Sequence, residues 1–355
     1  MRAAFGERFE ITPGYLNSAS IGVPPARVVD AVAAAVRRWA LGLDNAPAFG
    51  PDIATARAAW AALIGADPAE VAIGTAVSQL IASVAAAVPD GTRVLTVRGE
   101  FTSVTFPFAA QAHRGVTVTE VDPAELVDRA PGFDLVAVSA VQSADGAIAD
   151  LPGLRAAGTR VLLDVTQALG WLPMDLTWVD WVVGAGYKWL LSPRGAAWLA
   201  VRPHAREWTH PVAAGWFAGD NPWNSVYGMP LRLADDARAY DLGPAWFSQV
   251  GAAAALPWLA SLDIHAVHAH VVALADDLRA RFDLPPAGSA IVSLDLPDAA
   301  DRLTAVGIRF ATRAGRARLA FHLYNTVEDV DLAVNTVKRR PPARAREPSR
   351  MKRVE

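Results

Sequence analysis

The stretch Val183-Gly184-Ala185-Gly186-Tyr187-Lys188-Trp189-Leu190 places one lysine in an apolar, glycine-containing setting, directly after a segment that indicates a buried strand. An ammonium group in such a setting loses its hydration, so its charged form is disfavoured and its pKa falls. A lysine with a lowered pKa is a nucleophile that forms a Schiff base with a carbonyl group. The stretch therefore predicts a catalytic lysine, Lys188, on the loop after a strand.

A second apolar strand ends on a carboxylate. The run Leu162-Leu163-Asp164 closes a strand-like segment, and parallel sheets bind ligands at the carboxyl ends of their strands. An acid at a strand end together with a Schiff-base lysine indicates pyridoxal 5′-phosphate (PLP), because the pyridinium nitrogen of this cofactor requires an anionic partner. We therefore predict PLP as the cofactor, and Asp164 and Lys188 as the catalytic residues.

The composition argues against several other classes of protein. The 355 residues carry a net charge of only −3, whereas a nucleic-acid-binding protein would show a basic surface. The apolar runs are too short to span a bilayer, and the first eight residues lack the apolar core of a signal peptide. The chain has no cysteine, which excludes disulfides, thiolate metal sites and thiol nucleophiles. We expect a cytoplasmic protein with a small-molecule substrate, no metal, and neither nucleic acid nor membrane as partner.

Apolar runs alternate with segments that can form helices through the first two thirds of the chain. Near-continuous apolar strands in such an alternation are typical of an α/β fold with a mostly parallel sheet, covered by helices on both faces. The predicted strands are Glu70–Ile73, Arg93–Val97, Leu135–Ser139, Arg160–Asp164, Trp181–Gly184 and Ala196–Val201.

The same patterns divide the chain into four parts. We expect residues 1–24 to form an N-terminal segment packed on a small domain, and residues 25–244 to form the large, cofactor-binding domain. Residues 245–338 are expected to form the small α+β domain, with strands at Ile291–Leu294, Ile308–Ala311 and Arg318–His322. Residues 339–355 are basic and predict a disordered tail. Within the large domain, Glu207 to Pro244 loses all periodicity, which is typical of a lid or site loop.

Several motifs occur in the order of one known family. Asp164-x-x-Gln167 precedes Gly186-Tyr187-Lys188, and Gly74-Thr75-Ala76 and Arg318 with Tyr324-Asn325-Thr326 flank them. From Tyr15 to about Lys338 the chain resembles the class V aminotransferase family of fold-type I PLP enzymes. That family includes cysteine desulfurases, kynureninases, isopenicillin N epimerase-like proteins and C–S lyases. The resemblance implies a seven-stranded-type sheet in the large domain and a homodimer with a shared active site.

The resemblance also implies which residues hold the cofactor. Thr75 and Ala76 fall at a strand-to-helix junction and match the phosphate site, although Thr75 alone could equally cap the helix that follows. Phe101 falls where relatives stack a ring on the pyridine face, although a core phenylalanine is the competing interpretation. The remaining cofactor-binding matches are Ser143, Gln167, which would contact the phenolic oxygen, and Tyr187.

For the substrate, the family match assigns Arg318 to the α-carboxylate, which a guanidinium binds in a bidentate manner. The nearby Arg313 and Arg316 are expected to be solvated surface charges. The other predicted substrate-binding residues are Trp216, which matches a lid tryptophan, Asn17 and Asn224.

The chain also departs from its relatives. Kynureninases carry histidine at the position of Gln167, and desulfurases carry serine at the position of Ala185. Gly243 and Pro244 replace a threonine or asparagine that reaches the phosphate of the partner subunit in many relatives. That contact across the dimer is therefore expected to be lost.

The cofactor alone does not name the reaction. The absence of cysteine excludes a cysteine desulfurase of the usual mechanism, which needs a thiolate to accept sulfur. A lyase or epimerase, with Lys188 removing the α-proton, is the preferred interpretation, and an aminotransferase is the alternative. The aromatic segment Trp208–Trp223 suggests a large or aromatic side chain, and no feature of the sequence demands a second substrate arginine. A retired, non-catalytic binding protein is the remote alternative, which the intact Lys188 and Asp164 disfavour.

Overall fold

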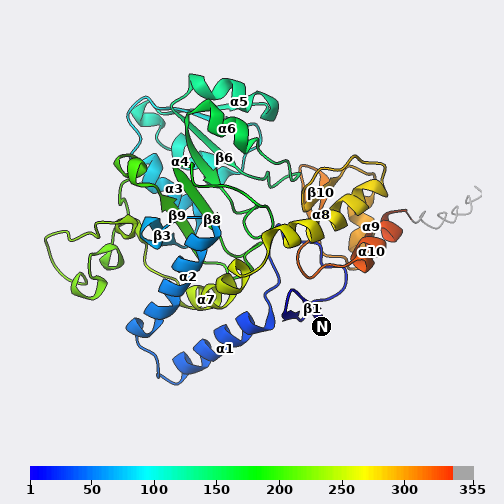
Figure 1. Cartoon of the computed structure of the whole chain (residues 1–355), viewed down its shortest axis with the longest axis horizontal. Helices are drawn as coiled ribbons and strands as arrows, with labels where there is room; N and C mark the ends of the chain where they lie inside the picture. The colour runs from blue at the N-terminus through cyan, green and yellow to red at the C-terminus, as the bar shows by residue number, and fades with distance from the viewer. Residues whose placement is uncertain (339–355) are drawn as a thin grey trace, which may run out of the picture.

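The computed structural model describes residues 1–338, and a seven-stranded sheet lies at the centre of this part of the chain (Figure 1). Its strand order is β3-β9-β8-β7-β6-β4-β5. Strand β9 runs antiparallel to both of its neighbours, and every other neighbouring pair is parallel, which confirms the mostly parallel α/β fold. The strands are β3 (Val71–Gly74), β4 (Arg93–Val97), β5 (Thr117–Val121), β6 (Leu135–Ser139), β7 (Arg160–Asp164), β8 (Trp181–Ala185) and β9 (Ala197–Val201).

Helices cover both faces of this sheet because the central strands bury side chains on both sides. Successive strand residues point to opposite faces, so Leu162 and Leu163 enter different core clusters. One face packs against α1 (Ala26–Ala40), α2 (Gly50–Leu63), α5 (Leu126–Arg129), α6 (Leu151–Ala157) and α7 (Trp246–Ala260). The other face packs against α3 (Val77–Ala85) and α4 (Thr102–Ala109).

A second, three-stranded antiparallel sheet lies to the right in Figure 1, with its own apolar core. Its order is β10-β12-β11, with β10 at Ile291–Leu294, β11 at Ala311–Arg313 and β12 at Arg316–Ala320. The last two strands begin two or three residues away from their predicted positions. A tight turn at Ala314 and Gly315, both with positive φ, sets the hairpin, and a hydrophobic pattern does not reveal it. The accompanying helices are α8 (Ile264–Ala280), α9 (Ala299–Ala305) and α10 (Val327–Lys338).

The start of the chain is tied to its far end. A hairpin of β1 (Arg2–Ala4) and β2 (Glu7–Phe9) opens the chain, and Arg2 forms an ion pair with Asp329 on α10. Further along, Asn17 forms a bridge to Ala320 at the end of β12. Residues 1–22 therefore lie between the small sheet and the loops of the large one.

Two predictions about the chain outside the central strands need comment. Strand β5 was not predicted, because an edge strand with one neighbour buries little and its sequence Thr-Val-Thr-Glu-Val shows no continuous apolar run. The aperiodic segment Glu207 to Pro244 contains only short 3₁₀ turns among its described elements. The predicted tail, 339–355, lies outside the described residues.

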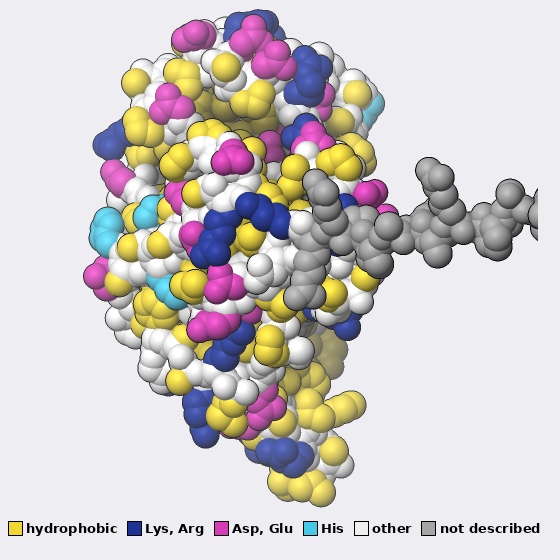
Figure 2. All heavy atoms as spheres, turned by 90° about the vertical axis from the view of Figure 1, so that its right-hand side faces the viewer, with side chains coloured by type: hydrophobic (Ala, Val, Ile, Leu, Met, Phe, Trp, Pro, Cys, Tyr) yellow, Lys and Arg dark blue, Asp and Glu magenta, His cyan; other side chains and the backbone are white. Residues whose placement is uncertain are grey.

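The surface mixes charges and apolar groups. On the face seen in Figure 2, basic and acidic side chains lie among apolar ones, and the apolar side chains gather at the lower end, where Figure 1 places α1. Among residues 1–338, no single helix has both the length and the apolarity to cross a membrane. Helices α7 and α8 meet that measure only when joined, and they are bent by 95° at the break between them.

A buried ion pair fixes strand β3 and helix α2 to the end of the aperiodic segment. Arg57 on α2 donates to Asp241 through both terminal nitrogens, at 3.0 and 2.6 Å, and Asp241 also accepts from the Ile73 amide. We expect Arg57→Met to lower the free energy of unfolding by about 3–5 kcal/mol, because it leaves a buried carboxylate unpaired. Urea unfolding measures the change. Arg93→Met, which removes an exposed pair with Asp134, is the control and should change stability little. Equal effects of the two variants would contradict the argument.

Candidate active site

A cavity of about 190 Å³ opens at the carboxyl ends of β6, β7 and β8, against the start of α3. This is the edge at which parallel sheets bind ligands. Its lining contains every residue predicted to bind the cofactor. The lining residues are Thr75, Ala76, Val77, Ser78, Phe101, Ser103, Ser139, Ser143, Asp164, Thr166, Gln167, Ala185, Tyr187, Lys188 and Arg194.

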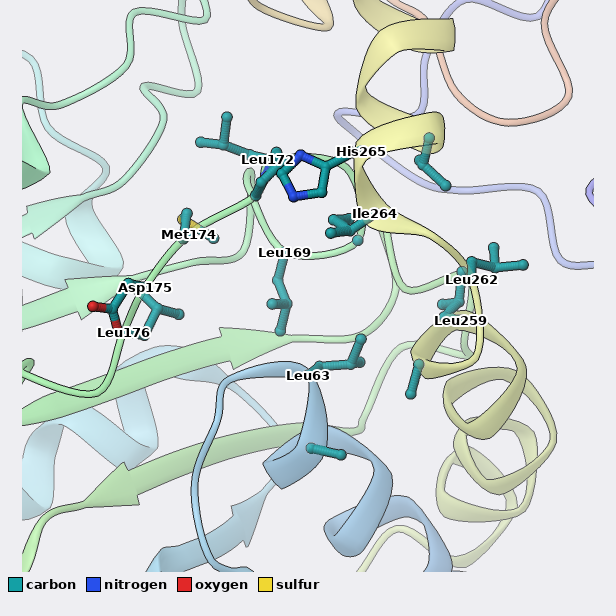
Figure 3. A pocket seen from close by; sticks show the side chains of 15 residues that line it. Leu63, Leu169, Leu172, Met174, Asp175, Leu176, Leu259, Leu262, Ile264 and His265 are labelled. Atoms are coloured by element: carbon teal, nitrogen blue, oxygen red, sulfur yellow. The ribbon is translucent and has the colours of Figure 1, made fainter.

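A larger cavity, of about 500 Å³, has a different character (Figure 3). It lies between the end of α2, the loop after β7 and the junction of α7 with α8. The side chains of Leu63 and Leu169 extend into the same space, and the ionisable residues of its lining are Asp175 and His265. It has no lysine in its lining, so the chemistry predicted for Lys188 belongs to the smaller cavity.

Lys188 follows β8 and is 6% exposed. Burial lowers the pKa of its amine to about 8, and the attraction of the Asp164 carboxylate opposes that change. The amine nitrogen lies 5.5 Å from the ring centre of Phe101 and 5.6 Å from that of Tyr187. The N-terminal segment closes the other side: the Gly22 amide donates to the Tyr187 carbonyl, and a Cβ on Gly22 would lie 2.0 Å from the Lys188 carbonyl oxygen.

Asp164 closes β7 and is also buried. Burial raises the pKa of its carboxyl group to about 6, and hydrogen bonds from Thr166 oppose that rise. The Thr166 amide donates to Asp164 at 2.8 Å, while the Thr166 hydroxyl accepts from the Ala185 amide at 3.1 Å. Thr166 therefore holds the carboxylate and the end of β8 together. Sequence reasoning missed it, although it lies between the motif residues Asp164 and Gln167.

The start of α3 offers free amide groups to the cavity. The N-cap is Ala76, which has no side chain that accepts from the first turn, and Thr75 instead donates its hydroxyl to Gln79. Thr75 therefore does not cap the helix, contrary to the competing interpretation. Unpaired amides at a helix start attract an anion, and the cavity also contains Arg194, 5.5 Å from the Tyr187 ring centre. Arg194 was missed because a lone arginine before a strand is an ordinary surface residue.

Phe101 is not a core residue, since its side chain is 45% exposed. Its backbone is held by the buried Glu100, whose carboxylate accepts from the Phe101 amide at 2.7 Å. Glu100 also accepts from the Ser139 amide and hydroxyl and from the Gln142 amide group. Glu100 was missed by sequence reasoning, because only the fold brings Ser139 and Gln142 to it.

Gln167 and Ser143 form part of the wall rather than a free surface. The Gln167 side-chain nitrogen donates to the Ala19 carbonyl at 3.0 Å and to the Ser143 hydroxyl at 3.1 Å. Its oxygen accepts from the Trp189 indole at 2.8 Å. Contact of Gln167 with the phenolic oxygen of the cofactor would replace one of these bonds, and it stays a prediction.

Arg318, on β12, reaches this cavity through Ser143. It is 1% exposed and donates to the Ser143 carbonyl, to the Ser143 hydroxyl at 3.1 Å and to the Ser20 hydroxyl at 2.7 Å. Its Nε has no partner among the described residues. Burial, and then the charge of Arg313, lower the pKa of Arg318 to about 10. A buried guanidinium with unused donors suits a carboxylate ligand.

The structure does not bring all predicted substrate residues to the cavity. Trp216 packs on Trp223 and Phe217, with ring centres 4.8 and 5.3 Å apart, and this segment borders a separate hollow against α2. Asn224 lies in the same segment, so neither residue lines the cavity of its own chain. Asn17 lies beside β12, and its side-chain oxygen is buried without a partner among the described residues.

The residues around the cavity fit PLP. Free amides and Arg194 at one end suit the phosphate, and the Asp164 carboxylate suits the pyridinium nitrogen. Lys188 supplies an amine whose pKa is already lowered, and the exposed Phe101 ring offers a stacking surface. No charge in the set opposes the binding of this group.

Comparison with known proteins gives the family. The family model for aminotransferase class-V matches residues 15–312. The uncharacterized aminotransferase YcbU of Bacillus subtilis (strain 168) is 28% identical over 309 residues, which covers 79% of this chain and 82% of that protein. Isopenicillin N epimerase of Streptomyces clavuligerus is 28% identical over 328 residues, covering 78% of this chain and 81% of that protein.

Solved structures share the fold. The cystine C–S lyase C-DES, in complex with its product cysteine persulfide, superposes with a TM-score of 0.82 at 20% identity, and the match covers 93% of this chain and 98% of that one. The cysteine desulfurase CsdA of Escherichia coli gives a TM-score of 0.78 at 21% identity, with 93% and 96% covered. Because the family model extends over most of the residues and the fold and cavity agree with it, the chain belongs to the class V aminotransferase family, as a fold-type I enzyme whose cofactor is pyridoxal 5′-phosphate.

Proposed function

We propose that this enzyme acts on the α-carbon of an amino acid as a lyase, through C–S cleavage or another β-elimination, or as an epimerase. The observation that carries the proposal is the placement of Lys188. Its buried amine, with a pKa of about 8, shares one cavity with Asp164, and Arg318 contacts the wall of that cavity at Ser143.

Each residue has a distinct task in this proposal. PLP, when bound, withdraws electrons from the α-carbon and so weakens the bonds to it. Lys188 holds the cofactor covalently and, once the substrate has replaced it, moves the α-proton through Nζ. Arg318 orients the substrate by its α-carboxylate, and Asp164 keeps the pyridinium nitrogen protonated. The start of α3 and Arg194 bind the phosphate.

The relatives support this choice without deciding it. Isopenicillin N epimerase is similar to this chain at 28% identity, and the C–S lyase C-DES shares its fold. A probable cysteine desulfurase of Pasteurella multocida is also similar, at 29% identity over 202 residues, but this chain has no cysteine to accept sulfur. Aminotransfer is the second candidate, because the aminotransferase YcbU is a relative over most of both chains.

One assay separates these reactions. The holoenzyme is incubated with a panel of L- and D-amino acids, with and without an acceptor keto acid, and keto acid, ammonia and inverted amino acid are measured. Keto acid and ammonia without an acceptor indicate the lyase, and inversion without an acceptor indicates the epimerase. Strict dependence on the acceptor would overturn both and establish the aminotransferase.

We also propose that the enzyme is a homodimer. Helix α1 and the turn after it expose Trp39, Leu41 and Leu43 by 63–73%. The segment that holds Trp216 exposes Tyr227, Met229 and Leu231. Exposed apolar side chains in such number mark an interface. Sedimentation equilibrium is expected to give twice the mass of the chain.

The interface is tested by a charge placed within it. Trp39→Glu should weaken association at least about tenfold, because it buries an unpaired carboxylate in the dimer. Val306→Glu, at a similarly exposed position beyond α9, should leave the mass unchanged. A monomeric wild type would contradict the proposal.

A further inference from the structure

Three arginines share one face of the small sheet. In the β11–β12 hairpin, Arg318 pairs with Ala311 and Arg313 pairs with Arg316. Alternate strand residues point to the same side, so Arg313, Arg316 and Arg318 lie on the same face, which Arg318 turns toward Ser143 and the cavity. Arg313 is the diagonal cross-strand neighbour of Arg318, a spacing of about 7–8 Å between backbones that long side chains bridge.

The three arginines differ in their partners. Arg316 forms an ion pair with Asp295 at 3.3 Å. Arg313 donates only to the carbonyl of its neighbour Thr312, at 2.9 Å. Within residues 1–338, neither Arg313 nor Arg318 forms an ion pair with a carboxylate. Two guanidinium groups without a carboxylate partner among the described residues therefore share this face of the hairpin.

Positive charge exceeds negative charge where the hairpin faces Lys188. Arg313 and Arg318 both lower the pKa of the Lys188 amine, after the larger effect of burial, which places all three cations within electrostatic reach of one another. The nearby carboxylates are already engaged: Asp164 by Thr166, and Glu100 by Ser139 and Gln142. The α-carboxylate of a substrate would neutralise Arg318 alone.

We propose that Arg313 binds a second carboxylate, at the end of the substrate side chain, so that the substrates are acidic amino acids. The inference rests on the proposed function, because it places the α-carboxylate on Arg318 and the α-carbon at Lys188. Arg313 is exposed and lies on the same face of the hairpin as Arg318, which contacts Ser143 in the wall of the cavity. This proposal differs from the expectations that Arg313 is only a solvated surface charge and that the substrate side chain is large or aromatic.

Binding of unreactive acids tests the subsite without turnover. Glutarate carries two carboxylates and butyrate carries one, and both are titrated into the holoenzyme by calorimetry. The wild type should bind glutarate about ten- to a hundredfold more tightly than butyrate, the range for a charge-assisted hydrogen-bonded pair. Arg313→Met should abolish this preference. Arg316→Met is the matched control, because that arginine shares the face but already pairs with Asp295, and it should keep the preference.

Kinetics give the second measurement. The ratio of kcat/KM for glutamate over glutamine, and for aspartate over asparagine, should favour the acids and fall at least about tenfold in Arg313→Met. The fall should come from the acidic substrates, with the neutral ones unchanged. Equal binding of glutarate and butyrate by the wild type, or loss of preference in Arg316→Met as well, overturns the inference. Selective glutarate binding without turnover of any amino acid supports the subsite and overturns the proposed reaction.

Discussion

Replacing Lys188 with alanine should abolish both turnover and the covalent retention of the cofactor. We expect kcat to fall by at least about 10⁴-fold, because the variant loses the nucleophile and the proton-transfer group at once. The cavity should still bind PLP reversibly, since the start of α3, Arg194 and Asp164 remain in place. The variant should therefore lose its cofactor on dialysis after borohydride treatment, while the wild type keeps it.

The chain offers an unusually clean control for this experiment. Within residues 1–338 the lysines are Lys188 and Lys338, and Lys338 ends α10 at the surface. Lys338→Ala should retain the cofactor and full activity. Retention of borohydride-fixed PLP by Lys188→Ala, or a wild type that shows no absorbance of bound cofactor after PLP is added, would contradict the assignment of Lys188.

The attachment should also depend on pH in a defined direction. Only the unprotonated amine attacks a carbonyl, and the lowered pKa of Lys188 is about 8. The rate of attachment to the apoenzyme should therefore rise with pH up to about 8 and level off above it. An ordinary exposed lysine would show this rise near its usual pKa of about 10.4. Stopped-flow absorbance across this range distinguishes the two.

Asp164→Asn should separate covalent attachment from catalysis. The substitution keeps the shape and the hydrogen bond from Thr166 but removes the charge that holds the pyridinium nitrogen protonated. We expect kcat to fall about 10²–10³-fold, the range for losing one preorganised electrostatic group. Attachment to Lys188 should persist. Borohydride fixation and steady-state kinetics measured on the same sample report both effects.

The same variant, Asp164→Asn, should also change the pKa of the Lys188 amine in a defined direction. The Asp164 carboxylate raises the pKa of the Lys188 amine, so its removal should lower that pKa below about 8. The midpoint of the attachment profile should move to lower pH. Asp175→Asn, in the larger cavity, is the control and should change neither kcat nor the midpoint. Unchanged kcat in Asp164→Asn would show that this carboxylate does not serve the cofactor.

The sequence predicts those parts of the fold and site that depend on local patterns. Buried central strands are mostly apolar, so β4, β6 and β7 could be placed to the residue. Asp164 was identifiable because it closes such a strand, and Lys188 because it lies on the loop after one. Edge strand β5 lacks this signal, because one of its sides has no neighbour and most of its residues are only half-buried or exposed.

What escaped prediction depends on distant parts of the chain meeting. Arg318 and Ser143 are 175 positions apart, and no local pattern shows that they touch. The buried carboxylate of Glu100 is explained by hydrogen bonds from Ser139, at the end of β6, and from Gln142. Arg313 looks like any surface arginine until the hairpin register places it on the same face as Arg318. For Trp216 the sequence pattern suggests a contact with the cavity, whereas its ring packs on Trp223 within the same aperiodic segment.

Contacts between the N-terminal segment and the small sheet and its helix bear on when Lys188 acquires its lowered pKa. The Gly22 amide donates to the Tyr187 carbonyl, next to Lys188. Asn17 forms a bridge to Ala320, and Arg2 forms an ion pair with Asp329, so both contacts join residues about 300 positions or more apart in the sequence. Contacts of such long separation form late. Until the small sheet is made, we therefore expect the Lys188 amine to keep the usual pKa of about 10.4, so that most of it is protonated and slow to attack aldehydes. The lowered pKa of Lys188, and with it fast attack on a carbonyl group, is thus expected only in the folded chain.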